Sequence, residues 1–320
     1  MADQYQRKIN YMRISITDLC NMRCLYCMPE EGIQKKSHKN MMSYEEMITL
    51  VKASVPLGIN KLRITGGEPL VRRGVVDLIY SLAAIEGINE ITMTTNGSLL
   101  EEMAEPLKKA GLTRFNISID SLKEERYKEI TRGGELKKVM NGIDKVIDLG
   151  MMPVKLNTVM IGGYNEDELD DFANLTYDHP IDVRFIELMP VGQASHWAKT
   201  RFISNETLRN RLGLLHPLKG NSGSPAKYYQ LAGAKGKIGF INPISDHFCG
   251  ECNRIRLTSD GKLKPCLHSN VEFDVLMALR KDPQNIENFI RSAIDAKPER
   301  HHLNQENAIY SERNMFQIGG

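Results

Sequence analysis

The sequence contains no apolar segment long enough to span a bilayer, and residues 1–8 lack the apolar core of a secretory signal peptide. It also lacks an excess of charge of one sign, because 42 Lys and Arg residues face 40 Asp and Glu residues, a net charge of +2. This balance argues against nonspecific binding to nucleic acid or to an anionic membrane as the main function. We therefore expect a cytoplasmic protein with no membrane partner and no nucleic-acid partner.

Cysteine is scarce too, and its six residues form two groups of three. The first cysteine group is Cys20, Cys24 and Cys27, and the second cysteine group is Cys249, Cys252 and Cys266. In the reducing cytoplasm, such groups indicate metal ligands rather than disulfides. The 320 residues, 41% of them hydrophobic, suffice for one large α/β barrel or two modest domains, and they contain no internal repeat or low-complexity tract.

The first cysteine group lies within eight residues, just after a stretch that reads as a strand. Thiolates ligate iron well, and three ligands on a four-iron cluster leave one iron open to another molecule. A ferredoxin would need a fourth cysteine nearby, and none follows until Cys249. The alternatives are a zinc site, which would lack its fourth ligand, and buried apolar cysteines, which rarely form a triplet with a polar insert.

Strand patterns alternate with helical patterns over the first 190 residues. The strand patterns cover residues 12–17, 61–65, 90–95, 114–120, 154–161 and 182–189. The helical patterns cover residues 44–58 (after a capping box at residues 43–46), 71–84, 99–110, 122–150 in two pieces, and 166–177. This alternation predicts a parallel sheet, which crossovers of one hand wind into an open or partial barrel.

One face of nearly every predicted strand is polar, whereas a filled barrel carries bulky apolar side chains there. The polar positions include the cations Arg13, Arg63, Lys155 and Arg184. Burying an unpaired cation is costly, so the interior is expected to hold an anion such as a polyphosphate, to which arginine offers forked contacts. The alternative is a structural network in which Glu68, Asp120 and Glu187 neutralise the cations.

Residues 66–69, Gly-Gly-Glu-Pro, follow the second predicted strand. Two glycines there serve either a tight strand-to-helix connection or a close approach of bare backbone to a ligand. The motif by itself does not separate these two interpretations.

Past Pro190 the alternation of strands and helices ends. We expect a helix over residues 204–212, short strands over 227–231 and 237–241, and a hairpin through 259–262 that returns Cys266 toward the other cysteines of its group. The spacing C-x2-C-x13-C fits a zinc site with His247 or His268 as fourth ligand, and it also fits an iron-sulfur cluster. Nearby Arg254 and Arg256 favour the cluster, because a zinc ribbon needs no basic lining.

The spacing C-x3-C-x2-C, with Tyr26 before its last cysteine, resembles the signature of the radical S-adenosylmethionine (SAM) superfamily. Residues 66–69 resemble that superfamily's motif for the amino group of SAM. The resemblance implies a 4Fe-4S cluster on Cys20, Cys24 and Cys27, with SAM on the open iron. One electron from the cluster would cleave SAM to methionine and a 5'-deoxyadenosyl radical.

Further motifs narrow the resemblance to the radical SAM enzymes that cyclise GTP in the first step of molybdenum-cofactor biosynthesis. These motifs are residues 13–29, residues 63–69, the second cysteine group with Arg254-Ile255-Arg256, and the terminal Ile318-Gly319-Gly320. The implied fold is an incomplete TIM-type (β/α)6 barrel, residues 1–190, whose open side is closed by a C-terminal α+β extension, residues 191–320. The implied reaction removes hydrogen from ribose C3' of GTP, joins C3' to guanine C8, and yields 3',8-cyclo-7,8-dihydro-GTP.

The resemblance also implies roles for single residues. SAM would contact Tyr26, Gly67, Ser118 and Met189. GTP would contact Arg13, Arg63, Thr94, Lys155, Arg184, Arg254, Ile255 and Arg256. Cys249, Cys252 and Cys266 would hold a second 4Fe-4S cluster, with its open iron toward the guanine ring. Catalysis would depend on Arg13, Arg184, Arg254, Arg256, Gly319 and Gly320.

The terminal Gly319 and Gly320 read either as a frayed tail or as a thin probe that enters the active site, as the tail of the resembling family does. The resemblance further implies an electron donor of the flavodoxin or ferredoxin type, transfer of the product to cyclic pyranopterin monophosphate synthase, and a homodimer. Two other function classes stay open. The first is a radical SAM enzyme that modifies a peptide, which the inward cations disfavour. The second is a metal-binding sensor, which the presence of residues 66–69 beside the first cysteine group disfavours.

Overall fold

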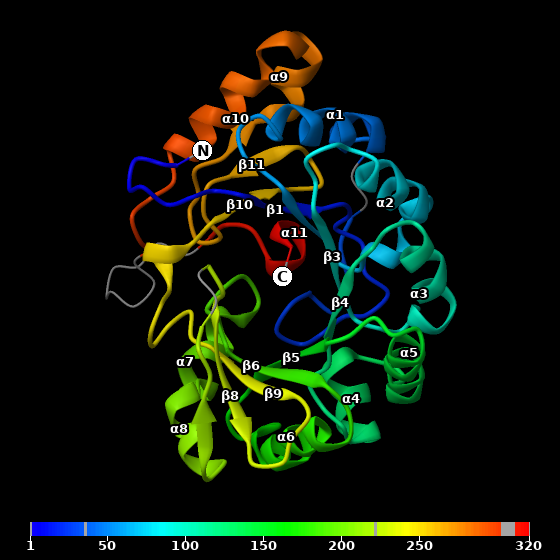
Figure 1. Ribbon diagram of the computed structural model, residues 1–320, viewed down its shortest axis with the longest axis vertical. Coiled ribbons are helices and arrows are strands. Elements are labelled where there is room, and N and C mark those ends of the chain that lie inside the picture. The colour runs from blue at the N-terminus through cyan, green and yellow to red at the C-terminus, as the bar shows by residue number, and fades with distance from the viewer. Residues whose placement is uncertain (1, 35–36, 221–222, 302–310, 320) are drawn as a thin grey trace.

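A computed structural model describes residues 2–34, 37–220, 223–301 and 311–319. Twelve strands of the described chain form one sheet, in the order β12-β11-β10-β1-β2-β3-β4-β5-β6-β9-β8-β7. The sheet curves around the centre of the molecule, and the helices that connect its first six strands lie outside it (Figure 1). This architecture confirms the predicted α/β class and the partial barrel.

The first six strands run parallel and overlap the six predicted stretches, with β1 and β6 each beginning one residue earlier than predicted. They are β1 (Tyr11–Ser15), β2 (Lys61–Thr65), β3 (Glu90–Thr95), β4 (Arg114–Ser118), β5 (Val154–Met160) and β6 (Ile181–Glu187). Each strand pairs with the next one along the chain. Parallel neighbours need a crossover connection, and the predicted helices supply it.

The crossover helices pack outside these strands. They are α1 (Tyr44–Ser54), α2 (Val75–Ala83), α3 (Leu100–Lys109), α4 (Glu124–Thr131), α5 (Leu136–Asp148) and α6 (Leu169–Asp178). Helix α1 begins at the predicted capping box, because the N–H of Glu46 donates to Oγ of Ser43 (3.2 Å) and the N–H of Ser43 donates to the Glu46 carboxylate (2.8 Å). The predicted 122–150 stretch divides at Arg132, which adopts a left-handed conformation with φ of 52°.

Residues after β6 extend the sheet at both edges. Strand β9 (Lys237–Ile241) lies parallel to β6 and leads to antiparallel β8 (Ala226–Leu231) and β7 (Leu215–Pro217). Strand β10 (Arg254–Leu257) lies parallel to β1 and leads to antiparallel β11 (Lys262–Lys264) and β12 (Phe273–Asp274). The predicted strands and hairpin are confirmed, but the sequence did not predict these two parallel pairings. The boundary at residue 190 stays a prediction, since one sheet contains strands from both sides of it.

The remaining helices follow β6 along the chain. They are α7 (Ala194–Arg201), α8 (Asn205–Arg211), α9 (Val275–Lys281), α10 (Ile286–Asp295) and α11 (Met315–Ile318). Short 3-10 helices are His38–Asn40, Pro69–Val71, Glu166–Glu168, Cys249–Glu251 and Pro283–Asn285. Within the described ranges, no helix has both the length and the apolar character that crossing a bilayer requires.

The register of the sheet separates a polar face from an apolar one. Arg256, Arg13 and Arg63 are neighbours across β10, β1 and β2, and Asn157 is the neighbour of Arg184 across β5 and β6. The alternate positions are buried in the hydrophobic core, among them Ile14, Leu62, Ile64, Ile91, Met93, Phe115 and Ile117. Strand alternation therefore places the predicted arginines on the inner face and the apolar side chains against the helices.

Candidate active site

The first cysteine group occupies the loop that follows β1. Its three thiols form no disulfide, and they line a cavity of about 190 Å³, the first cavity. The loop is held by its backbone, because the N–H groups of Arg23 and Leu25 donate to the carbonyl oxygens of Thr131 (3.0 Å) and Ile130 (2.9 Å) at the end of α4. The thiols are therefore grouped by the fold without bonding to one another.

Burial disfavours the ionised form of these thiols. It raises the pKa of Cys20 to about 11 and that of Cys27 to about 12, and it raises the pKa of Cys24 well above the ordinary value. The neighbouring carboxylate of Asp120 raises the pKa of Cys24 and Cys27 further. Thiolates in this setting need a compensating positive charge, which a metal centre supplies when it displaces the protons. The donor set fits such a centre.

Residues 66–69 pack their backbone against the cysteine loop. The N–H of Gly67 donates to the carbonyl oxygen of Thr17 (2.8 Å), and the N–H of Glu68 donates to that of Leu19 (2.9 Å). A Cβ at position 67 would lie 2.5 Å from the carbonyl oxygen of Leu19, so the position requires glycine. The two glycines thus let the backbone of residues 66–69 approach the cysteine loop closely.

The four residues predicted to contact SAM all line the first cavity. They are Tyr26, Gly67, Ser118 and Met189. The hydroxyl of Tyr26 donates to Asp120 at 2.6 Å, and burial raises the pKa of Asp120 to about 6, although this bond and the Val159 N–H lower it. Thr94, predicted to contact GTP, also lines the first cavity.

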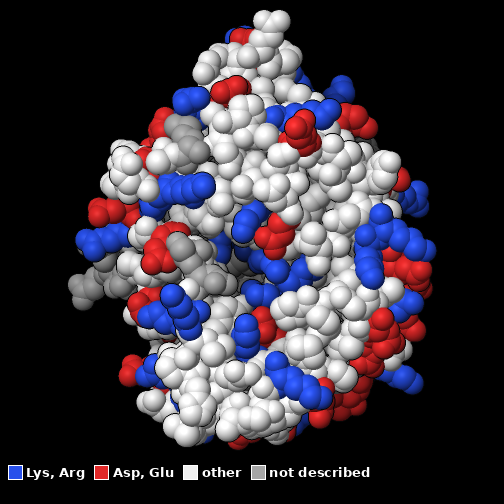
Figure 2. Space-filling model, in the orientation of Figure 1, with Lys and Arg blue, Asp and Glu red and all other residues white. Residues whose placement is uncertain are grey.

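A second cavity, of about 170 Å³, lies between the first cavity and the second cysteine group. Four residues line both cavities, namely Asn157, Ile186, Met189 and Met315. Five arginines line the second one, namely Arg13, Arg63, Arg184, Arg254 and Arg256. Figure 2 shows basic side chains inside the hollow at the middle of one face. The structure therefore brings the predicted arginines and both cysteine groups around adjoining spaces.

Burial destabilises the charges on these arginines. It lowers the pKa of Arg184 and of Arg256 to about 10, and the guanidinium of Arg254 adds to the effect on Arg256. Burial and the neighbouring Arg256 lower the pKa of Arg13 well below the ordinary value. Arg184 has a neutral partner, because its Nη2 donates to Oδ1 of Asn116 at 2.6 Å. An anionic ligand would relieve this repulsion.

The carboxylates that would neutralise these cations in the alternative of a structural network are engaged elsewhere. Glu68, Asp120 and Glu187 accept hydrogen bonds from backbone N–H groups and hydroxyls, such as Thr95 to Glu68 (2.8 Å) and Tyr26 to Asp120 (2.6 Å). Within the residues that the structure describes, none of the three forms an ion pair with an arginine of the second cavity. The positive charge of the second cavity is therefore not cancelled by these groups, and the cavity fits an anion.

Two predicted GTP contacts, Lys155 and Ile255, line neither cavity. Nζ of Lys155 donates to the hydroxyl of Tyr228 (3.1 Å) and lies 3.4 Å from the carboxylate of Asp182. Ile255 is fully buried in the hydrophobic core on the opposite face of β10. Successive side chains of a strand alternate, so a residue between Arg254 and Arg256 must point away from the cavity that they line. The side chain of Ile255 therefore cannot supply the predicted contact.

At the second cysteine group, nearby cations favour a thiolate on Cys252. Burial alone raises its pKa, but Lys297 and Arg254 outweigh burial and lower it. Lys297 is almost fully buried, and its Nζ donates to the carbonyl oxygens of Arg254 (2.8 Å) and Pro265 (2.9 Å). Sequence reasoning missed Lys297, because a lysine outside any motif carries no signal of its own.

Three histidines also line the second cavity, namely His247, His268 and His301. The donor atoms of His247, Cys249 and His301 lie within 4.8 Å of one another. His268 has a buried Nδ1 with no hydrogen-bond partner among the described residues. The sequence named His247 and His268 as candidate zinc ligands but not His301, so the geometry leaves zinc and an iron-sulfur cluster open here.

The C-terminal tail enters the barrel. Helix α11 lies at the centre of the molecule (Figure 1), and Met315 and Phe316 line the first cavity. Nη1 of Arg256 donates to the carbonyl oxygens of Gly319 (2.6 Å) and Ile318 (3.2 Å). The structure thus favours a tail that enters the active site over a frayed end. Gly320 lies outside the described residues.

Comparison with known proteins assigns the family. Residues 14–176 match the Radical SAM superfamily, and residues 181–303 match Molybdenum Cofactor Synthesis C. A GTP 3',8-cyclase of Alkaliphilus oremlandii is 61% identical over 320 residues, which cover 100% of both chains. The chain belongs to the GTP 3',8-cyclase family of radical SAM enzymes. A further member, from Alkaliphilus metalliredigens, is 59% identical, also over 100% of both chains. The predicted resemblance is confirmed. The chain is a radical SAM enzyme, and its family binds a 4Fe-4S cluster and SAM.

Solved structures share the fold at low identity. SuiB of Streptococcus suis, bound to its precursor peptide SuiA, has a TM-score of 0.64 at 14% identity, covering 97% of this chain and 76% of SuiB. SuiB bound to S-adenosylmethionine has a TM-score of 0.61 at 14% identity, covering 89% of this chain and 68% of SuiB. At such identity the likeness concerns the fold, and the substrate must be argued from the site.

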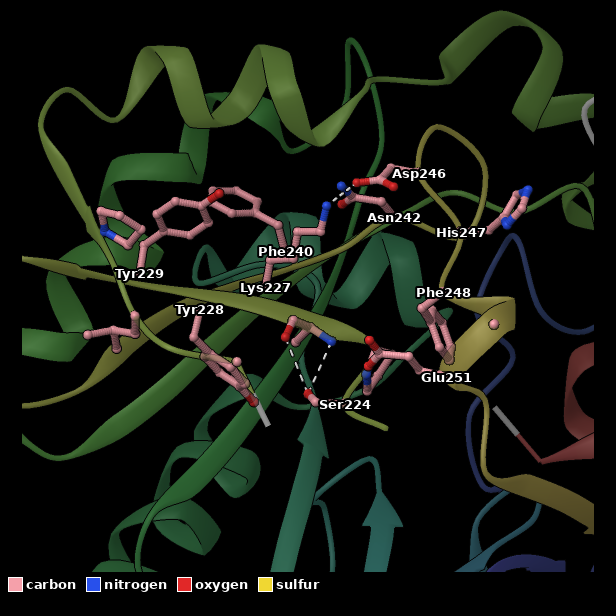
Figure 3. A pocket seen from close by; sticks show the side chains of 16 residues that line it. Ser224, Lys227, Tyr228, Tyr229, Phe240, Asn242, Asp246, His247, Phe248 and Glu251 are labelled. Atoms are coloured by element: carbon pink, nitrogen blue, oxygen red, sulfur yellow. Dashed lines mark hydrogen bonds and ion pairs between the residues drawn. The ribbon is translucent and has the colours of Figure 1, made fainter. Parts of the chain in front are cut away.

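In the present chain, a groove of about 690 Å³ adjoins the second cavity (Figure 3). Pro225, His247 and Phe248 line both spaces. Lys227 of β8 forms an ion pair with Asp246 at the groove. The sequence did not predict this groove. The groove forms only because β8 and β9 extend the sheet beyond β6, and no local motif marks that pairing.

Proposed function

We propose that this chain converts GTP to (8S)-3',8-cyclo-7,8-dihydroguanosine 5'-triphosphate, the first step of molybdenum-cofactor biosynthesis. Membership of the GTP 3',8-cyclase family supports the reaction. The observation of the structure that supports it most is the second cavity, where five arginines lie next to the second cysteine group. A triphosphate is the kind of anion that such a lining binds.

The cofactors would occupy the two cysteine groups. The first group would hold a 4Fe-4S cluster, and Tyr26, Gly67, Ser118 and Met189 would contact SAM beside it. When bound, this pair supplies a 5'-deoxyadenosyl radical that removes hydrogen from ribose C3' of GTP. The second group would hold a second 4Fe-4S cluster, which the lowered pKa of Cys252 supports, since thiolates are the ligands.

The protein's own contribution would be to bind and orient GTP. Ring closure between two atoms of one molecule gains most from orientation, and the guanidinium groups can fix the triphosphate at several points. Thr94 would contact the substrate from the first cavity. Lys155 would have to break its hydrogen bond to the hydroxyl of Tyr228 before it could bind GTP. The tail would exclude water above the bound substrate. Turnover would thus depend on Arg13, Arg184, Arg254, Arg256, Gly319 and Gly320.

The partners follow from the same reaction. A one-electron donor of the flavodoxin or ferredoxin type would reduce the clusters, and the product would pass to cyclic pyranopterin monophosphate synthase. We further propose a cytoplasmic homodimer, with residues 1–190 as the barrel and residues 191–320 as the extension.

The test is anaerobic reconstitution with iron and sulfide, followed by SAM, a reductant and GTP. Formation of 5'-deoxyadenosine that requires GTP is expected, and the variant Cys24→Ala should abolish it. ATP is the matched control, because it carries the same triphosphate without guanine and should yield none. Zinc in place of iron, with no 5'-deoxyadenosine, would instead indicate the metal-binding sensor, and release driven by peptides but not by GTP would indicate the peptide enzyme.

A further inference from the structure

Three imidazole rings meet beside the second cysteine group. The ring of His301 lies 4.8 Å from that of His247 and 4.6 Å from that of His268, measured between centroids. The donor atoms of His247, Cys249 and His301 are mutually within 4.8 Å. His301 is therefore the middle ring of the three, next to a cysteine that lies far from it in sequence.

The segment that carries His301 is fastened to the cysteine loop. Buried Arg7 donates from Nη1 to the carbonyl oxygens of Cys249 and Glu299, both at 2.9 Å, and from Nη2 to that of Pro298 at 2.8 Å. The backbone N–H of His301 hydrogen-bonds the sulfur of Cys249. A buried arginine that joins two distant segments in this way holds the backbone before His301 against the cysteine loop.

Lys297 ties the same segment to the remaining cysteines. Its Nζ donates to the carbonyl oxygen of Arg254, two residues after Cys252, and to that of Pro265, which precedes Cys266. The segment over residues 297–301 thus contacts the chain next to all three thiols. Any group bound by these thiols would have His301 at its edge.

Three thiolates leave one iron of a four-iron cluster without a protein ligand. Imidazole nitrogen is a common ligand of iron, and as a neutral ligand it is exchangeable. We propose that His301 is the fourth ligand of the second cluster when GTP is absent, and that GTP displaces it. This inference rests on the proposed function, because it needs the second 4Fe-4S cluster.

The placement explains why His301, and not its two neighbours, would be the exchangeable ligand. His247 and His268 each lie two residues from a cysteine of the group, so moving either one would disturb a thiolate. His301 comes from a segment that carries no cysteine, so its side chain can turn away while the three thiolates stay in place. The open iron would then be covered between turnovers and exposed only by substrate.

The test uses the full chain, grown with ¹⁵N-labelled histidine, reconstituted anaerobically and reduced. No histidine is among the described residues that line the first cavity, so a ¹⁵N coupling in the pulsed EPR spectrum reports on the second cluster. We expect a ¹⁵N coupling without GTP and its loss on adding unlabelled GTP. The variant His301→Ala should lose the coupling before GTP is added, whereas the matched variants His247→Ala and His268→Ala should keep it.

The outcomes separate this inference from the proposed function. About eight irons per chain with no ¹⁵N coupling, or a coupling lost in His247→Ala but kept in His301→Ala, would overturn the histidine ligand alone. About four irons with one zinc per chain would overturn both the inference and the second cluster. The unsubstituted protein with and without GTP shows whether a histidine is displaced, and this result does not depend on the folding of any variant. The variants then assign the coupling to His301.

Discussion

Nη1 of Arg256 lies 2.6 Å from the carbonyl oxygen of Gly319 and donates a hydrogen bond to it. One residue lines the second cavity and the other belongs to the C-terminal tail, so the bond ties the tail to the inside of the barrel. A Cβ on Gly319 would lie 2.3 Å from Cγ2 of Thr65, and its φ of +73° suits glycine. The tail can reach this place only because its end is thin.

Deleting Gly319 and Gly320 should therefore lower turnover of GTP. The bond from Arg256 is charge-assisted, and the loss of about 1.5–3 kcal/mol predicts a fall of roughly 10- to 100-fold in kcat. The measurement is the formation of the cyclised nucleotide under saturating GTP, with iron content as the control for intact clusters. Turnover equal to that of the full chain, at equal iron content, would show that the tail has no part in the reaction.

Replacing Gly67 with alanine should damage the first cavity. The new Cβ would meet backbone carbonyl oxygens of Leu19 and Asp18 at 2.5 and 2.7 Å, and neither atom can rotate away. We expect a loss of about 1–3 kcal/mol in the free energy of unfolding of the cluster-free chain, as for overpacked sites, and weaker SAM cleavage after reconstitution. Urea unfolding measures the first effect and 5'-deoxyadenosine yield the second.

The matched control for this change is Gly220→Ala. A Cβ at position 220 would have no heavy atom of the described residues within 4 Å, so the substitution should leave both measurements unchanged. If Gly67→Ala unfolds like Gly220→Ala and still cleaves SAM, the close approach of the two loops is not a requirement of the site.

Much of this site could be predicted because strands alternate. Arg13, Arg63 and Arg184 fall on one face of their strands by position alone, and each lines the second cavity. The same rule, applied strictly, places the side chain of Ile255 on the face opposite to Arg254 and Arg256. It was predicted as a contact only because the motif contains it.

Other parts of the site have no local signal. Pairing of β10 with β1 joins residues from opposite ends of the chain, and the apolar face of β10 indicates burial without naming a partner strand. Arg7 and Lys297 donate hydrogen bonds to backbone carbonyl oxygens of distant segments. His301 lies near Cys249, from which it is far in sequence. Every residue type offers the same carbonyl oxygen, so no motif marks the place where such a bond forms.

Replacing Arg184 with methionine should weaken GTP binding. The variant keeps much of the side-chain volume but removes one buried guanidinium from the second cavity, and it leaves Oδ1 of Asn116 without its 2.6 Å donor. A charged hydrogen bond lost to phosphate predicts a rise in Kd of roughly 10- to 100-fold. Calorimetric titration of the reconstituted enzyme with GTP measures it.

Arg291→Met is the matched control for Arg184→Met. Arg291 pairs with Glu287 on the exposed face of α10, where an ion pair contributes little. The Kd of the Arg291→Met variant for GTP should equal that of the unsubstituted enzyme. Equal affinities for both variants would mean that the second cavity does not bind the triphosphate through Arg184.

The stability of the cluster-free chain should depend on the protonation of Glu68. Burial raises the pKa of this carboxyl from the ordinary 4.5 to about 7, although the N–H groups of Asn96 and Leu70 and the hydroxyl of Thr95 lower it by donating to it. Between these two values the folded chain holds a proton that the unfolded chain has released, so stability falls as pH rises through this window. The unfavourable contribution is absent below about pH 4.5 and complete above about pH 7.

The variant Glu68→Gln isolates this effect, because an amide does not titrate. At about 1.4 kcal/mol per pKa unit, the unfolding free energy of the unsubstituted chain, relative to the variant, should fall by roughly 3 kcal/mol across the window. Urea unfolding of both cluster-free chains at a series of pH values measures the difference, in which the other titrating groups cancel. A difference that stays constant from pH 4.5 to pH 7 would show that hydrogen bonds, rather than burial, dominate at Glu68 and keep its carboxylate ionised.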